Sequence, residues 1–155
     1  MIYKQYLQSP AGALEIQANE SNIIRVFFTD ENSPSDHSNP VTRNAKQQLQ
    51  AYFDGQLKTF DLPLEPEGTT FQKTIWHHLQ QIPFGQSLSY SDVGKIAGHS
   101  KAVRAIGVAN SRNPICIIIP CHRVIGRDGR LTGYSGGLHR KAWLLEHEQV
   151  AFKFA

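Results

Sequence analysis

The segment Pro120-Cys121-His122-Arg123 places a nucleophile beside groups that could activate it. A thiol becomes a strong nucleophile only as the thiolate, and neighbouring cationic or basic side chains favour that form. Most isolated cysteines are small buried hydrophobic residues, but a proline, a histidine and an arginine crowd this one. Glu148 could orient the histidine as the third member of a Cys–His–acid relay. We therefore predict that Cys121 is a reactive thiolate.

The second cysteine, Cys116, has apolar neighbours and is predicted to be a structural core residue. If residues 115–119 are extended, the two sulfurs lie roughly 15 Å apart, too far for a disulfide. A metal site is not expected either, because Cys121 and His122 are adjacent and no second cysteine pair exists. The sequence implies no cofactor.

The residues around Cys121 suggest how it is positioned. Residues 115–119 form an apolar, largely β-branched run that predicts a strand buried on both faces. Pro120 would end the ladder and deliver Cys121 to the rim of the core at the start of a turn. Five glycines follow between residues 126 and 137, where the backbone could approach a flat ligand closely. Residues 131–135 would form one wall of that pocket, and residues 138–147 a final helix with Leu138, Ala142 and Leu145 facing inward.

Three further helices are predicted before this centre. A capping-box pattern opens a helix at Thr69, which Pro83 and Gly85 end, and a second helix starts at 89–92. The first helix has the apolar stripe Phe71, Ile75 and Leu79, and the second has Val93, Ile96 and Ala97. A turn at 98–100 leads to a third helix over 101–111, with Val103 and Ile106 facing inward. Helix, glycine-containing turn and helix is the helix-turn-helix pattern, although many helical hairpins that share it bind nothing.

The helix over 101–111 has an unusual surface. Small residues predominate on it: Ala102, Ala105, Gly107 and Ala109. A helix that reads base edges in the major groove projects long polar side chains, whereas small residues suit close contact with a minor groove. Arg104 is its long cationic side chain, and it is suited to insertion between bases.

Charge is divided unevenly along the chain. The 155 residues carry a net charge of +3, but residues 1–66 carry −3 and residues 67–155 carry +6. A polyanion would be attracted to the second part. A basic surface that is merely solvated would show the same pattern.

The first part of the chain is expected to be a supporting domain. Residues 2–8, 13–18 and 22–28 predict an antiparallel meander, residues 30–40 a loop, and residues 41–53 a helix. Prolines 63 and 66 mark a linker, so we expect domains at 1–66 and 67–155. Without an apolar run of about 18 residues or a secretory signal pattern, and with two cysteines only, a reducing cytoplasmic setting is expected.

The motif Pro120–Gly126 together with Asn113-Pro114, Gly133–Leu138, Ile82–Gly85, Ser89-Tyr90 and Arg104–Gly107 resembles the O6-alkylguanine-DNA alkyltransferases. The match extends from about Phe71 to Glu148. The resemblance implies a ribonuclease-H-like α/β N-terminal domain and a mainly α C-terminal domain with a winged-helix-like helix-turn-helix. It also implies a single-use enzyme that moves an alkyl group from O6-alkylguanine in double-stranded DNA to its cysteine after base flipping.

The resemblance implies roles for individual residues. Cys121 would be the alkyl acceptor, His122 the general base acting through a water, and Glu148 the acid that orients it. Asn113 would be a hinge, Tyr90 would rotate the target phosphate and protonate guanine N3, and Arg104 would fill the gap left by the flipped base. The remaining expected DNA contacts are Ala102, Ala105, Ser89, Arg112 and Arg123. The remaining expected pocket residues are Val124, Tyr134, Ser135, Gly136, Leu131 and Cys116.

Several alternatives stay open. Ser111 stands where many members have glycine, and Cys116 can line the pocket, so both could alter the alkyl groups accepted. A non-catalytic alkylguanine binder of the same fold would lack the acceptor cysteine. A helix-turn-helix regulator would show no thiol chemistry, and a cysteine hydrolase using Cys121, His122 and Glu148 would turn over. O4-alkylthymine as a second substrate and cooperative binding of a monomer along DNA are also left open.

Overall fold

The computed structural model describes residues 1–30 and 36–154. Two compact units make up the chain, Met1–Glu67 and Gly68–Ala155. The division falls one residue beyond the expected boundary between 66 and 67. Part of the loop expected at 30–40 lies outside the described residues. No helix in the described ranges has both the length and the apolar character needed to cross a membrane.

The first unit contains an antiparallel sheet of three strands in the order β1-β2-β3. The strands are β1 (Tyr3–Ser9), β2 (Gly12–Ala18) and β3 (Ile23–Phe28). Each begins within one residue of its predicted start, because polar turn segments separate the three β-rich runs. The predicted meander is confirmed.

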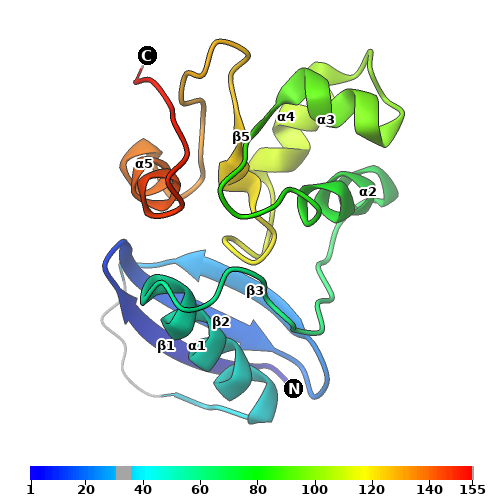
Figure 1. Ribbon diagram of the computed structural model, residues 1–155. Helices are drawn as coiled ribbons and strands as arrows, with labels where there is room; N and C mark the ends of the chain where they lie inside the picture. Colours follow the sequence, from blue (N-terminus) through cyan, green and yellow to red (C-terminus); the bar gives the residue numbers. More distant parts are fainter. Residues whose placement is uncertain (31–35, 155) are drawn as a thin grey trace. The chain divides into compact units, whose positions relative to one another are not determined.

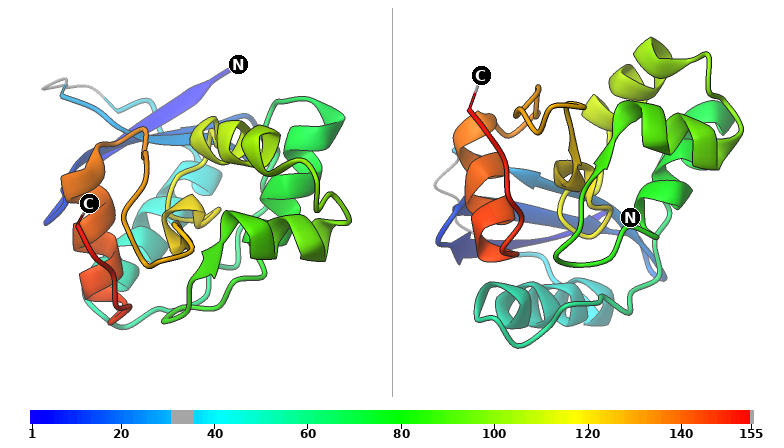
Figure 2. Two further views of the ribbon diagram at one scale, coloured as in Figure 1. Left: turned by 90° about the horizontal axis from the view of Figure 1, so that it is seen from above. Right: turned by 45° about the horizontal axis from the view of Figure 1, so that its top comes forward.

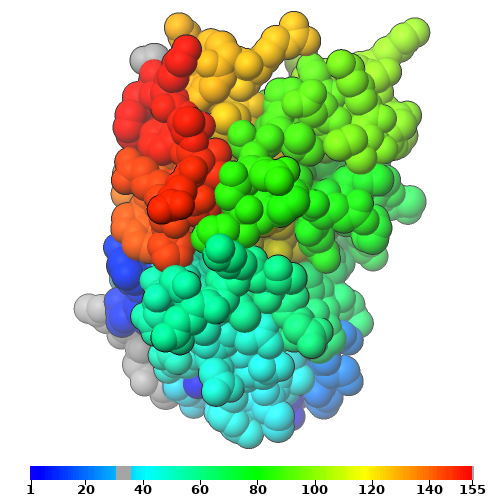
Figure 3. Space-filling view, viewed as in Figure 1, coloured from blue at the N-terminus to red at the C-terminus, as the bar shows by residue number. Residues whose placement is uncertain are grey.

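One helix, α1 (Pro40–Phe53), packs on this sheet (Figure 1). Asn39 caps its first turn through a reciprocal capping box, and Pro40 occupies the first helical position, where no amide donor is needed. Ala45, Leu49 and Tyr52 are fully buried, as the spacing predicted. On the face of the molecule shown in Figure 3, the cyan to teal chain of α1 and the following loop hides most of the blue strands.

The second unit begins with three packed helices, α2 (Thr70–Leu79), α3 (Tyr90–Ala97) and α4 (Val103–Ser111). The predicted capping boxes at Thr69 and Ser89 are both present. Trp76, which the four-residue stripe of α2 did not include, is buried, and its indole Nε1 donates to the carbonyl oxygen of Ala109 at 2.8 Å. This bond fastens α2 to the end of α4.

Helices α3 and α4 form a helix-turn-helix, seen in green in Figure 2. Gly98 ends α3 in the left-handed conformation with φ of 75°. Gly94 lets the helices approach, since a Cβ there would lie 3.1 Å from Ile106 Cδ1. Ile106 is buried as predicted, but Ile96 and Val103 are 56% and 40% exposed. Their predicted inward orientation is wrong, because the buried face of α3 is formed by Val93 and Gly94 and that of α4 by Ile106, Ala109 and Asn110.

The strand predicted over residues 115–119 is absent, and that prediction is wrong. The segment is buried, but it turns back on itself, with Ile119 N donating to Ile115 O at 3.0 Å and Ile117 at φ of 72°. The Asn113 side chain replaces a ladder: its Oδ1 accepts from Ile115 N at 2.9 Å and its Nδ2 donates to Ile119 O at 2.7 Å. The apolar run therefore reflected burial and not strand pairing.

The unit ends with helix α5 (Leu138–His147), and a short parallel pairing joins the parts before and after Cys121. Strand β4 (Leu88–Ser89) pairs with β5 (Val124–Ile125). Ala142 and Leu145 of α5 are buried, but Leu138 is 41% exposed, so its predicted inward orientation is wrong. A cluster of buried apolar residues fixes α5 to the chain that follows Cys121: Ile125, Leu131, Ala142, Leu145 and Val150.

Candidate active site

Cys121 opens a short 3-10 turn, η1 (Cys121–Arg123), directly after Pro120. Its position at the start of a turn agrees with the prediction. The residue is only 3% exposed, and this burial raises the pKa of the thiol. A hydrogen bond from Asn113 and the positive charge of Lys141 act in the opposite direction. The net direction is upward, so Cys121 rests as the thiol, and the predicted thiolate forms only when a base takes the proton. The side chains that favour the thiolate are Asn113 and Lys141, and not the adjacent His122 and Arg123 that the sequence had suggested.

Lys141 was not among the predicted site residues. It lies on α5 and is fully buried, and its Nζ donates to the carbonyl oxygens of Val124 at 2.7 Å and Thr132 at 3.2 Å. Burial lowers its pKa to about 8. Its burial could not be inferred from spacing, because a lysine on a short helix is usually solvated. The structure makes it the cation that acts on Cys121.

His122 and Glu148 form a fully buried pair, with His122 Nε2 2.7 Å from Glu148 Oε2. Hydrogen bonds and opposite charges from His122 and Arg123 outweigh burial and lower the pKa of Glu148 to about 2. Glu148 is thus an acceptor only, so Nε2 carries the proton. Burial lowers the pKa of His122, which favours the neutral ring.

The other ring nitrogen of His122 is then free to act as a base. With the proton on Nε2, Nδ1 of the neutral ring holds a lone pair. This atom is buried and has no hydrogen-bond partner within residues 1–30 and 36–154. A buried acceptor on the residue next to a thiol can take up a proton.

Arg123 does not lie on a DNA-binding surface, and that prediction is corrected. Its side chain is only 6% exposed. Its Nε and Nη2 donate to the two Glu148 oxygens at 2.7 and 3.1 Å, and Nη1 donates to the carbonyl oxygen of Ile82 at 2.6 Å. A bidentate pair of this kind fixes the carboxylate orientation. Arg123 therefore holds Glu148 in place for His122.

Tyr90, at the first position of α3, is half-buried, and its hydroxyl forms a hydrogen bond with the hydroxyl of Thr132. Burial raises its pKa, and the hydrogen bond to Thr132 opposes this rise. The phenol therefore stays protonated at neutral pH. A charge on Cys121 also raises the pKa of Tyr90. Ser89, the residue before it, uses its hydroxyl to cap α3.

The predicted pocket residues have different environments. Tyr134 is half-buried, Ser135 is exposed and Gly136 is half-buried. Cys116 is buried, and this burial strongly raises the pKa of its thiol, so that it stays protonated. Both cysteines are free. Leu131, 4% exposed, packs into the cluster beneath α5, so its predicted place in the pocket wall is wrong.

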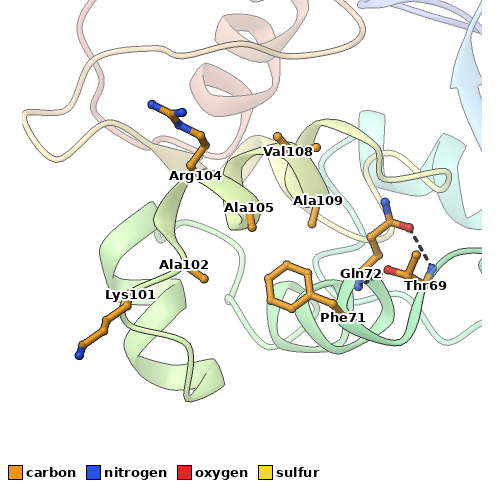
Figure 4. A pocket seen from close by; sticks show the side chains of 9 residues that line it. All are labelled: Thr69, Phe71, Gln72, Lys101, Ala102, Arg104, Ala105, Val108 and Ala109. Carbon is orange, nitrogen blue, oxygen red and sulfur yellow. Dashed lines mark hydrogen bonds between the residues drawn. The ribbon is translucent and has the colours of Figure 1, made fainter.

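The surface of α4 presents the predicted DNA contacts. Arg104, Ala105 and Arg112 are exposed, and Ala102 is half-exposed. A groove of about 600 Å³ runs between α4 and the start of α2, and Figure 4 shows the side chains of Ala102, Ala105 and Ala109 facing Phe71 across it. Arg104 also lines the groove, and its guanidinium end points away from Phe71 in the same view. Two of the eight basic residues between 101 and 141, Arg123 and Lys141, are buried.

Family models cover nearly the whole chain. The 6-O-methylguanine DNA methyltransferase ribonuclease-like domain matches residues 2–66, and the DNA-binding domain of the same methyltransferase matches residues 70–150. The chain belongs to this family. Its fold class, a ribonuclease-like α/β domain followed by a mainly helical DNA-binding domain, is thereby confirmed.

Individual relatives match along their full length. The chain is 44% identical to the methylated-DNA–protein-cysteine methyltransferase of Methanosarcina barkeri, covering 96% of this chain and 98% of that one. It is 44% identical to the constitutive methyltransferase of Bacillus subtilis, covering 99% of each. The Mycobacterium tuberculosis O6-methylguanine methyltransferase superposes with a TM-score of 0.87 at 39% identity, covering 96% and 93%. A structure of the M. tuberculosis protein in complex with DNA also gives 0.87 at 40% identity, covering 94% and 92%.

Proposed function

We propose that this protein repairs DNA by moving an alkyl group from the O6 atom of guanine to Cys121, once per molecule. The observation that carries the proposal is the buried arrangement of Cys121 beside a neutral His122 whose Nε2 is held by Glu148. The adjacent charge of Lys141 favours the thiolate. The printed names of the relatives describe methyl transfer from DNA to a cysteine.

The reaction begins with proton transfer. His122 Nδ1 accepts the Cys121 proton through a water molecule, and Glu148 stabilises the imidazolium that forms. The thiolate then attacks the alkyl carbon in line with the C–O bond. An S–C bond forms, the C–O bond breaks, and its electron pair stays on guanine O6. Tyr90 donates its proton to N3 of the departing guanine, which leaves as the neutral base.

The burial of Cys121 requires the target base to leave the helix. A sulfur in a residue 3% exposed is out of reach of a base stacked in a duplex. The small, exposed side of α4 at Ala102 and Ala105 would lie in the minor groove, with Arg104 in the gap left by the extruded base. Asn113 ties the end of α4 to the segment before Cys121 and so links DNA contact to the acceptor.

The competing functions fit the site less well. A regulator that reads the major groove would present long polar side chains where α4 has alanines. A hydrolase needs an intermediate that water can cleave, and a thioether is not cleaved in this way. A binder that lacks chemistry needs no acceptor, whereas Cys121 is present. We propose double-stranded DNA with O6-alkylguanine as the partner of a protein that acts as a monomer.

Stoichiometry tests this proposal. Wild-type protein is incubated with excess duplex DNA that carries O6-methylguanine with a radiolabelled methyl group. We expect one label per protein, none in Cys121→Ser, and full labelling in Cys116→Ala. Cys121→Ser should still bind the duplex, because only the sulfur is replaced. Multiple turnovers, or labelling of Cys121→Ser, would overturn the proposal.

A further inference from the structure

We propose that Thr132 is a positioning residue, whose hydroxyl holds the Tyr90 hydroxyl in place for proton donation to the leaving base. This inference rests on the proposed alkyl transfer and adds a residue to it. It starts from the hydrogen bond between the two hydroxyls, which joins the first turn of α3 to the loop before α5 across 42 residues of sequence.

Thr132 is itself held firmly. Its carbonyl oxygen accepts from the buried Lys141 Nζ at 3.2 Å, and the preceding residue, Leu131, is fixed in the apolar cluster beneath α5. The Tyr90 ring lies beside Gly107 of α4, where an added Cβ would be at an ordinary contact distance of 3.9 Å from the ring. The hydroxyl of the phenol is held by Thr132.

The proposed reaction determines which hydroxyl donates in the hydrogen bond between Tyr90 and Thr132. A tyrosine that protonates a base must point its own proton at that base. Its oxygen can then accept a hydrogen bond from another donor, and Thr132 Oγ1 is the donor within reach. When the proton leaves Tyr90 for guanine N3, the oxygen becomes a phenolate, and the Thr132 proton stays on Oγ1 and stabilises that charge. The phenolate regains a proton from solvent after the base has left.

The electrostatics of Tyr90 agree with this role. Burial and the neighbouring Cys121 raise the pKa of the phenol, which makes the phenolate harder to form. The Thr132 hydrogen bond acts in the opposite direction. Without it, the phenol would lose the hydrogen bond that holds its hydroxyl and that favours release of the proton.

The test compares Thr132→Val, which removes the hydroxyl at similar volume, with Thr132→Ser, which keeps it. Thr59→Val, at an exposed position in the first unit, is the matched control. Single-turnover methyl transfer from duplex DNA should be about tenfold slower in Thr132→Val, with Thr132→Ser and Thr59→Val close to wild type. In a Tyr90→Phe background Thr132→Val should cause no further loss. If Thr132→Val does not fold, Thr132→Ala is compared with Thr132→Ser in its place.

A second readout distinguishes positioning from a structural effect. With tyrosine labelled by ¹³C at Cζ, an NMR titration should show a higher pKa of Tyr90 in Thr132→Val than in wild type, because a bond that favours the phenolate is lost. An unchanged Tyr90 pKa, or an equal rate loss in the Tyr90→Phe background, would overturn the role of Thr132. The wild-type protein in the same assay distinguishes failure of the Thr132 role from failure of the proposed function. If the wild-type protein transfers no methyl group, the proposed function itself is refuted.

Discussion

Replacing Glu148 with Gln should strongly destabilise the second unit. The carboxylate faces His122 at 2.7 Å and Arg123 at 2.7 and 3.1 Å. Loss of its charge leaves the Arg123 guanidinium buried without a counter-ion, and breaking such a pair costs about 3–5 kcal/mol. The lowered pKa of Glu148 has the same sign, because the folded unit favours the carboxylate over the protonated acid. Glu146→Gln, exposed in the last turn of α5 and two residues before Glu148, is the matched control.

Urea unfolding followed by tryptophan fluorescence measures this loss. Trp76 and Trp143, the two tryptophans of the chain, both lie in the second unit, so the signal reports on that unit. A carboxylate with a lowered pKa contributes its full stabilisation above pH 4.5 and loses it as pH falls towards 2. The difference in the free energy of unfolding between wild type and Glu148→Gln should therefore become smaller as pH falls from 4.5 towards 2. Equal stability of the Glu148→Gln and Glu146→Gln proteins at neutral pH would refute the reasoning.

Three further predictions concern the reaction. Arg104→Ala should slow repair of duplex DNA while reaction with free O6-benzylguanine stays near wild type, because only the duplex requires base flipping; equal losses would exclude the finger role. Lys141→Met should raise the pKa of Cys121 and slow methyl transfer about tenfold or more. The pKa of Cys121 is measured from the rate of thiol alkylation as a function of pH. An unchanged pH profile would exclude the electrostatic role of Lys141. As pH is lowered from neutral, the wild-type transfer rate should fall only below pH 6.5, because the lowered pKa of His122 keeps the base neutral above that pH. A fall that begins between pH 7.0 and 6.5 would contradict this assignment.

The local patterns that predicted the fold correctly are of two kinds. The capping boxes at Thr69 and Ser89 are bonds between a side chain and nearby backbone. The three strands are β-rich runs separated by polar turn segments, so that neighbours in sequence pair with each other. The buried run at 115–119 was misassigned because the partner that decides its conformation, the Asn113 amide, is a side chain. Hydrophobicity reports burial, and a buried backbone can be satisfied in more than one way.

In the candidate site, too, the sequence predicted residues by their own chemistry and missed those that depend on distant partners. Cys121, His122 and Glu148 were singled out by their chemistry, and the structure brings the last two into contact. Lys141 was missed as a site group, and Thr132 was expected only as part of the pocket wall, because their importance comes from burial and from hydrogen bonds to residues far along the chain. Arg123 was expected to contact DNA from the family resemblance, although its charge is neutralised by Glu148. The sign of a charge predicts a partner only when its exposure is known.

The central claim concerns one sulfur atom, and peptide mass mapping tests it directly. After reaction of the wild-type protein with O6-methylguanine DNA, proteolysis between the two cysteines is needed to separate Cys116 from Cys121, or the Cys116→Ala protein can be mapped instead. The account predicts that the Cys121 peptide gains the mass of one methylene unit in every molecule that has reacted. Modification at Cys116, or repaired DNA beside an unmodified Cys121, would contradict it.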